Sequence, residues 1–254
     1  MPRLAPLLLA ATLALAPLPA TAQAQAAPAD TTPQIAPAFR VSELGAIARF
    51  RGLNDTRGGC SAVLISPRYA LTAAHCSRSG PLPTDGRARG LTFFPESDAP
   101  QYRVAATVAE PHPRHTNARL TADNARFDIA LLRLAVDVPA EIATPLPIAP
   151  FNPLAPEGRY AIFGYLNRND GPLHGQEACQ VVRLSGGVLG SDCHVRSGFS
   201  GGALLRQTAE GWALVGITVA QIPGNEGQLR SLIAPVTPGI WPELDAVGQF
   251  APPD

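Results

Sequence analysis

The chain has 254 residues, a length that suits one large all-β domain or two smaller ones. Hydrophobic residues make up 46% of it, so a sizeable core can be buried, and 23 Gly with 27 Pro favour short strands joined by many turns over long helices. The formal net charge is zero and no long basic or acidic run occurs, which makes nucleic acid an unexpected partner.

The first 26 residues have the pattern of a secretory signal peptide. Arg3 supplies a positive charge, residues 4–18 form an apolar stretch rich in Leu and Ala, and small-x-small cleavage sites follow between Ala20 and Ala26. A membrane anchor is the alternative, but prolines interrupt the apolar stretch and it is short for a span. We therefore expect an exported protein, secreted or periplasmic in a bacterium, whose mature form has no membrane span.

Residues 27–40 are rich in Pro, Ala and Thr, which is typical of a flexible leader or propeptide. Strand-like runs then recur at short intervals, and a proline-studded stretch, 144–156, divides them into two sets. The predicted strands are 61–65, 69–72, 102–109 and 129–134 before the prolines, and 159–163, 179–184, 188–193, 203–206 and 212–219 after them.

Two β-rich halves joined by a proline linker predict an all-β fold of two packed barrels, over residues 41–150 and 151–254. Ser185-Gly186-Gly187 is a predicted turn between two strands of the second half. A short helix is expected near residues 241–247.

Export implies an oxidising compartment, in which the four cysteines are read as two disulfides. Four cysteines permit three pairings, and proximity along the chain favours Cys60–Cys76 and Cys179–Cys193. A zinc site is the competing interpretation, but no CxxC pair occurs, so we expect no metal.

Three segments carry groups suited to nucleophilic catalysis. They are Leu71-Thr72-Ala73-Ala74-His75-Cys76, Asp128-Ile129-Ala130-Leu131-Leu132 and Gly198-Phe199-Ser200-Gly201-Gly202. A serine hydroxyl needs a base to take its proton, and the histidine that does so needs a carboxylate to fix its tautomer. Each residue alone has an ordinary structural explanation, but together they offer a base, an acid and a nucleophile.

The order of the three along the chain discriminates between folds. The Gly198-x-Ser200-x-Gly202 pattern also fits the nucleophile elbow of α/β-hydrolases, which place their histidine after the serine. No histidine follows Ser200 here, so that interpretation lacks its base. The order His75, Asp128, Ser200 is the one found in chymotrypsin.

From about residue 59 to residue 216 the chain resembles the trypsin/chymotrypsin family, and more closely its exported bacterial branch related to glutamyl endopeptidases. The resemblance implies two six-stranded antiparallel β-barrels of the chymotrypsin type, with a short C-terminal helix. It also implies a secreted serine endopeptidase that uses His75, Asp128 and Ser200 as its triad, without a cofactor, on a peptide or protein substrate. Cys60 and Cys76 match the family's disulfide beside the histidine.

The implied mechanism is acyl transfer through an acyl-enzyme. Ser200 attacks a peptide carbonyl, His75 relays the proton to the leaving amine and Asp128 orients His75. The backbone N–H groups of Gly198 and Ser200 form the oxyanion hole, and glycine's wide φ range suits such a loop. We expect a monomer.

The sequence departs from the family at two places. Phe199 stands where zymogens carry the Asp that pairs with a newly formed N-terminus, so we expect activity independent of that ion pair. By its offset from Ser200, His194 falls near the base of the specificity pocket, where it could favour an acidic or polar side chain and disfavour Arg or Lys. The strand that lines the pocket in the family corresponds here to Thr218, Val219, Ala220 and Gln221.

Other residues have plain structural interpretations. We expect His112 and His115 on an exposed loop, His174 at the surface, and Phe94, Phe163 and Trp212 in the core. Two functions compete with the endopeptidase: a binding or regulatory protein with an unproductive triad, for which Phe199 is the argument, and an esterase that uses the same triad.

Overall fold

The computed structural model describes residues 44–54, 59–77, 80–83, 85, 88–94, 101–155, 159–167, 173–223 and 228–246. The predicted signal peptide (1–26) and leader (27–40) lie outside the described residues and stay predictions. Within the described part of the chain, no helix is both long and apolar enough to cross a membrane.

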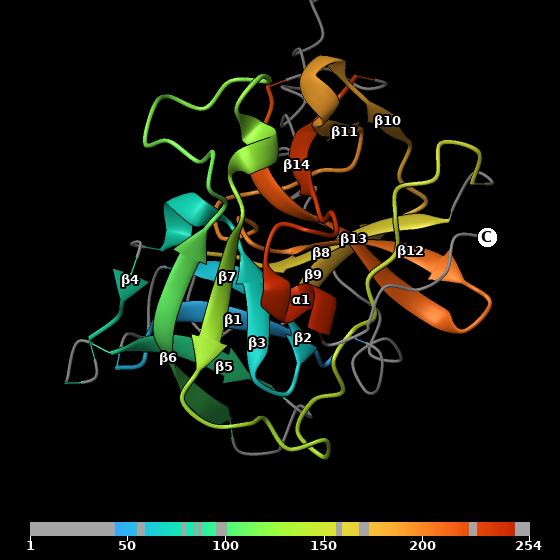
Figure 1. Cartoon of the computed structure of the whole chain (residues 1–254). Helices are drawn as coiled ribbons and strands as arrows, with labels where there is room; N and C mark the ends of the chain where they lie inside the picture. The colour runs from blue at the N-terminus through green and yellow to red at the C-terminus, as the bar shows by residue number, and fades with distance from the viewer. Residues whose placement is uncertain are drawn as a thin grey trace, which may run out of the picture. The chain divides into compact units, whose positions relative to one another are not determined.

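The first sheet closes on itself (Figure 1). Its pairing order is β4-β6-β5-β1-β2-β3-β7, and β6 also pairs with β7, so the six strands other than β4 form a closed antiparallel ring. The strands are β1 (Ile47–Gly52), β2 (Cys60–Ser66), β3 (Tyr69–Thr72), β4 (Gly80–Pro81), β5 (Arg89–Phe93), β6 (Tyr102–Pro111) and β7 (Ala130–Leu134).

The second sheet has the order β10-β11-β14-β13-β12-β8-β9. Its strands are β8 (Tyr160–Tyr165), β9 (Leu173–Glu177), β10 (Val181–Arg183), β11 (Leu189–Ser191), β12 (Ala203–Thr208), β13 (Gly211–Gln221) and β14 (Ser231–Pro235). β9 and β10 stand at opposite ends of this order, yet only three residues separate them, and one of these, Ala178, has a φ of 58°. One bent stretch of chain therefore pairs with β8 and then with β11, which closes a ring of six. The predicted pair of six-stranded antiparallel barrels is confirmed.

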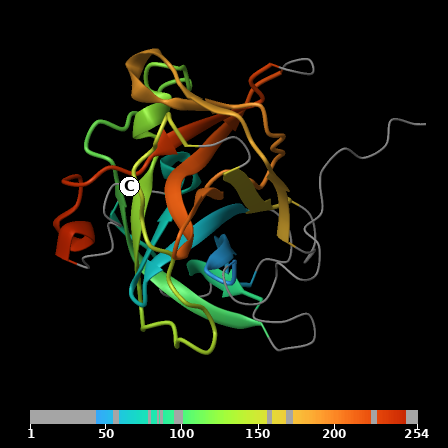
Figure 2. The ribbon, with the colours of Figure 1, turned by 90° about the vertical axis from the view of Figure 1, so that its right-hand side faces the viewer.

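Helical structure is sparse in the described residues. Three 3-10 turns occur, η2 (Ala74–Cys76), η3 (Ala125–Phe127) and η4 (Ser185–Gly187), the last at the predicted turn. The expected short helix is α1 (Pro242–Ala246). It follows the last strand of the second barrel but lies on the side of the first in both views (Figures 1 and 2), and the ring of Trp241 lies 6.4 Å from that of His112.

The strands follow from their apolar patterns. β2 and the middle of β13 are almost continuously apolar, and both are buried along nearly their whole length. β6 mixes small apolar residues that are buried, such as Ala106 and Ala109, with partly exposed ones. Predicted strand 69–72 is confirmed to the residue as β3. Charged residues or glycines interrupt the apolar runs of β1, β5 and β9, which were missed. The two-residue strand β4 and the apolar strand β14 were missed as well.

The predicted core is confirmed in part. Phe163 and Trp212 are buried, and Phe94 is partly buried against the main apolar cluster. The prediction for His174 is wrong: it is buried, because it lies on the missed strand β9, paired with Gly164 of β8.

The proline-rich stretch contacts both barrels. The N–H of Leu146 donates to the carbonyl of Leu64 in β2 (3.0 Å), and the N–H of Ala149 donates to that of Leu214 in β13 (2.9 Å). The stretch is thus paired backbone to backbone with both sheets. The domain boundaries at 41–150 and 151–254 stay predictions.

Both predicted disulfides are present. Cys60–Cys76 joins β2 to η2, with a Cα–Cα distance of 6.2 Å, and Cys179–Cys193 joins the bend after β9 to the loop after β11, at 5.4 Å. The sequence separations are 16 and 14 residues, so each closes a loop of similar length.

We predict that replacing both cysteines of either pair with Ala lowers the free energy of unfolding by a similar amount, about 3 kcal/mol, because the two loops have nearly equal closure entropy. Urea unfolding of the double variants C60A/C76A and C179A/C193A measures it. A loss at one pair several times that at the other would show that native contacts, not loop entropy, decide.

Candidate active site

Strand register brings His75 and Asp128 together. β3 pairs with β7 so that Thr72 lies opposite Ala130. His75 follows Thr72 by three residues, in η2, and Asp128 precedes Ala130 by two, at the end of η3. Both side chains therefore emerge at the same end of one strand pair.

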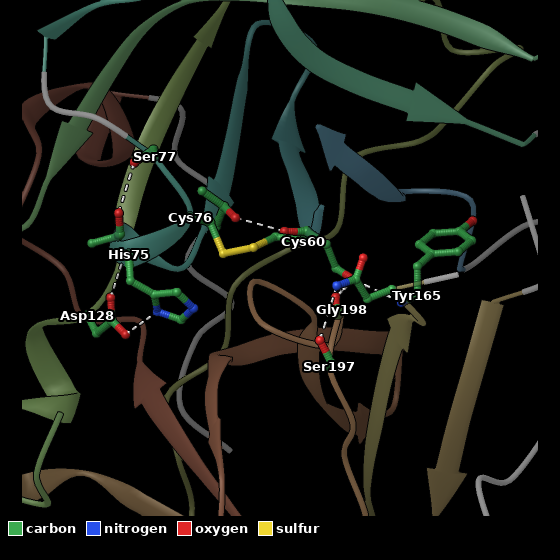
Figure 3. Close-up of a disulfide and its surroundings, with 12 residues drawn as sticks. Cys60, His75, Cys76, Ser77, Asp128, Tyr165, Ser197 and Gly198 are labelled. Carbon is green, nitrogen blue, oxygen red and sulfur yellow. Dashed lines mark hydrogen bonds and ion pairs between the residues drawn. A yellow bond between two sulfur atoms is a disulfide. The ribbon is translucent and has the colours of Figure 1, made fainter. Parts of the chain in front are cut away.

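The contact between them is close and doubled. His75 Nδ1 lies 2.6 Å from Asp128 Oδ2, and the backbone N–H of His75 donates to Asp128 Oδ1 at 2.8 Å (Figure 3). The Asp128 side chain is fully buried, whereas 44% of the His75 side chain is exposed. Because a carboxylate only accepts hydrogen bonds, Nδ1 carries the hydrogen and Nε2 of the neutral ring keeps its lone pair. This arrangement orients a base toward solvent.

A second imidazole, unexpected from the sequence, faces the same carboxylate. His115 Nδ1 lies 3.8 Å from Asp128 Oδ1, and its side chain is only 13% exposed. The prediction that His115 lies on an exposed loop is therefore wrong, because the chain between β6 and β7 folds back over Asp128. His112 is half-buried, with its ring 4.8 Å from that of Phe127. The His-x-x-His spacing itself gave no signal for this packing.

In the loop that carries Ser200, the carbonyl groups of Ser197 and Phe199 accept hydrogen bonds from other backbone N–H groups. The Ser197 carbonyl accepts from the N–H of Asn167 (2.8 Å), and the Phe199 carbonyl accepts from that of Gly202 (2.7 Å). In a trans peptide the N–H points opposite to the C=O, so the N–H groups of Gly198 and Ser200 face the other way. Among the described residues we find no acceptor for either N–H.

Ser200 itself is half-buried, and its backbone is tied to the first barrel. Its carbonyl accepts from the N–H of Ser61 in β2 at 2.7 Å. Within the described part of the chain, no hydrogen bond joins the Ser200 hydroxyl to His75.

Phe199 occupies an apolar cluster of the second barrel. Its side chain is 1% exposed and packs with residues that include Ile162, Leu204 and the Cys179–Cys193 pair. A Cβ added to Gly164 would lie 3.0 Å from Phe199 Cγ, so the ring packs directly over that glycine. A buried aromatic side chain thus anchors the loop at the position directly before Ser200.

The predicted specificity residues lie in different environments. Thr218 is buried and pairs with the Ser200 loop: its carbonyl accepts from the N–H of Gly201 and its N–H donates to the carbonyl of Gly202, both at 2.8 Å. Val219 lines a cavity of about 400 Å³ together with His75, His115 and Asp128. Ala220 is half-buried and Gln221 is exposed, farther along β13.

His194 is half-buried in the loop after β11, and its backbone N–H donates to Gln176 Oε1 at 3.0 Å. Burial lowers the pKa of His194 below its ordinary value, and the nearby Arg230 and Arg196 lower it further, against a smaller opposing effect of Asp192. The neutral imidazole is therefore favoured at neutral pH.

One set of residues in the described chain has the spacing of metal ligands: Cys60, His75 and Cys76, whose ligand atoms lie within 4.8 Å of one another. The two sulfurs are bonded to each other, and a disulfide supplies no thiolate to a metal. This set therefore does not fit a metal site.

Residues 60–217 match the model of the trypsin-like peptidase domain, which covers more than half of the chain. The chain belongs to the trypsin-like peptidase family. Solved structures support the double-barrel chymotrypsin fold. Neuropsin, a serine protease expressed in the limbic system of mouse brain, superposes with a TM-score of 0.57 at 18% identity, over 81% of this chain and 93% of that one. The structure of GrC gives 0.55 at 18%, over 80% and 92%.

Two curated relatives are insect serine proteases. CLIP domain-containing serine protease B15 of Anopheles gambiae is 30% identical over 210 residues, which are 65% of this chain and 55% of the relative. Serine protease snk of Drosophila melanogaster is 35% identical over 80 residues, 32% of this chain and 17% of the relative. The chain thus spans about half or less of these relatives' length, and neither relative supports the expected bacterial branch.

We predict that Gly198→Ala disrupts the loop. Gly198 has a φ of 101°, and an added Cβ would lie 2.3 Å from the backbone nitrogen of Asn167. We expect a loss of stability well above the about 1 kcal/mol of left-handed strain alone, measured by urea unfolding.

Gly80→Ala is the matched control, because Gly80 also has a left-handed φ, 92°, but none of the described residues lies within 4 Å of an added Cβ. Equal losses for the two variants would mean that the loop yields to the new methyl group.

Proposed function

We propose that the protein is an exported serine endopeptidase that hydrolyses peptide bonds through an acyl-enzyme on Ser200. His75 is the general base and then the general acid, and Asp128 holds its tautomer and stabilises the imidazolium. No cofactor takes part, the substrate is a peptide or protein, and the enzyme acts as a monomer.

The observation that carries the proposal is the combination of an oriented base with two free N–H groups. The exposed Nε2 edge of His75 is set by the buried Asp128 carboxylate, 2.6 Å from Nδ1. Across the site, the N–H groups of Gly198 and Ser200 have no acceptor in the described chain. A tetrahedral oxyanion formed by attack of Ser200 is the group that such a pair of donors would stabilise.

The Ser200 hydroxyl makes no hydrogen bond to His75 within the described residues, which is common in substrate-free sites, where such contacts tighten only in the complex. The same observation favours the second candidate function, a binding or regulatory protein with an unproductive triad. An esterase that uses the same three residues is the third.

Both disulfides fit an oxidising compartment, and we propose that the protein is exported into one.

A fluorophosphonate probe tests the central proposal. We expect stoichiometric labelling at Ser200, because the probe needs an activated serine and an oxyanion hole, and no labelling of Ser200→Ala. Asp128→Asn should lower kcat by about 10⁴-fold, the loss seen in this family when the carboxylate that orients the histidine is replaced.

A wild-type protein that the probe does not label would contradict the peptidase proposal and favour the binding or regulatory function. If the probe labels the protein and the protein hydrolyses simple esters but not casein, the result would favour the esterase over the endopeptidase.

We further propose that the primary specificity pocket prefers acidic or polar side chains over Arg and Lys. Arg230 and Arg196 lie close enough to His194 to lower its pKa further, after the larger effect of burial. Positive charge on this side of the site would attract a carboxylate and repel a basic side chain.

This proposal predicts a pH-dependent preference. Because the pKa of His194 lies below its ordinary value of 6.5, the ring gains its proton only as the pH falls under that value. The ratio of kcat/KM for a Glu peptide over its Gln counterpart should rise as the pH falls below 6.5, up to about tenfold once the ring is charged, which is the worth of one charged hydrogen bond.

The ratio cancels the titration of the triad, which both peptides share. His194→Ala should make the ratio flat over this range. A wild-type ratio that does not change with pH would contradict the proposal that His194 lines the specificity pocket.

A further inference from the structure

Ser61, near the start of β2, makes four hydrogen bonds although it is fully buried. Its hydroxyl donates to the carbonyl of Gly198 (2.9 Å) and accepts from the N–H of Tyr165 (2.8 Å). Its N–H donates to the Ser200 carbonyl (2.7 Å), and its own carbonyl accepts from Thr72 Oγ1 (2.7 Å). Three of these four bonds join the first barrel to the second.

The hydroxyl bond is one of two hydrogen bonds that hold a single peptide of the Ser200 loop. The peptide between Gly198 and Phe199 is held at its carbonyl by Ser61 and at its N–H by the Arg196 carbonyl (2.9 Å). Gly198 has a φ of 101°, and without a Cβ it has little intrinsic resistance to rotation. Rotation of this peptide would re-aim the neighbouring N–H groups of Gly198 and Ser200.

The Phe199 ring restrains the same loop from the other side. The ring is buried over Gly164 of β8. Tyr165, which follows Gly164 in the chain, donates its backbone N–H to the Ser61 hydroxyl. Among the described residues, the loop is therefore held between an apolar cluster on one side and the Ser61 hydroxyl on the other.

We propose that Ser61 is a positioning residue whose hydroxyl locks the Gly198 peptide, so that the N–H groups of Gly198 and Ser200 stay aimed at the oxyanion. This inference rests on the proposed peptidase function for its catalytic meaning. Its structural half, an ordered loop over residues 197–202, stands independently.

The test compares Ser61→Ala with Ser66→Ala. Ser66 is a matched control because it is also a buried serine of β2, and its hydroxyl oxygen accepts from the N–H groups of Arg68 (3.3 Å) and Tyr69 (3.1 Å), away from the Ser200 loop. We would measure kcat and KM on one peptide substrate, and hydrogen exchange of the peptide that covers residues 197–202. Where Ser61→Ala does not fold, Ser61→Gly takes its place, because it leaves room for a water.

We expect Ser61→Ala to lower kcat about 10- to 100-fold, somewhat less than removal of an oxyanion donor outright, with KM changed less than about threefold. Exchange over residues 197–202 should be faster than in Ser66→Ala. A general loss of stability would instead affect both variants alike and leave kcat per labelled site unchanged.

A kcat for Ser61→Ala within about twofold of that for Ser66→Ala would overturn the inference. If the wild type hydrolyses nothing, the proposed function fails and exchange alone decides. Faster exchange over residues 197–202 in Ser61→Ala than in Ser66→Ala would then support the ordering of the loop by Ser61. Equal exchange in the two variants would contradict it.

Discussion

The loop that carries Ser200 belongs to the second barrel but is held in place by the first. Ser61 bonds to the carbonyls of Gly198 and Ser200, and Gly201 comes so near that an added Cβ would lie 1.9 Å from the Ser61 carbonyl oxygen. Only glycine at position 201 allows the backbone of the loop to come this close to β2. The geometry of the whole site depends on this contact.

The Cys60–Cys76 disulfide extends that contact to the base. Cys60 directly precedes Ser61, and Cys76 directly follows His75. Figure 3 shows the disulfide between the His75–Asp128 pair on one side and Gly198 with Tyr165 on the other. A covalent link and a hydrogen-bonded serine thus connect the two halves of the site through a few residues of one barrel, which limits how far they can move apart.

Two further features belong to the surroundings of the site. Phe199 anchors the Ser200 loop by apolar burial. His115 places a second ring nitrogen 3.8 Å from the Asp128 carboxylate, too far for a hydrogen bond but close enough to add to its electrostatic environment. Both features leave the contact between His75 and Asp128 intact.

The sequence by itself determined the broad class, the two disulfide pairs, the pairing of His75 with Asp128 and nine of the strands, because each depends on local motifs or short separations. It did not reveal β9, which is rich in polar residues and glycine and is recognised only by its pairing with β8. That omission also misplaced His174. The tertiary structure alone decided the roles of Ser61 and His115. Ser61 bonds to Gly198 over 137 residues, and His115 reaches Asp128 only because a loop folds back over it. Contacts of this kind leave no periodic or compositional trace, since one hydroxyl or imidazole acquires its partners only when distant backbone segments meet.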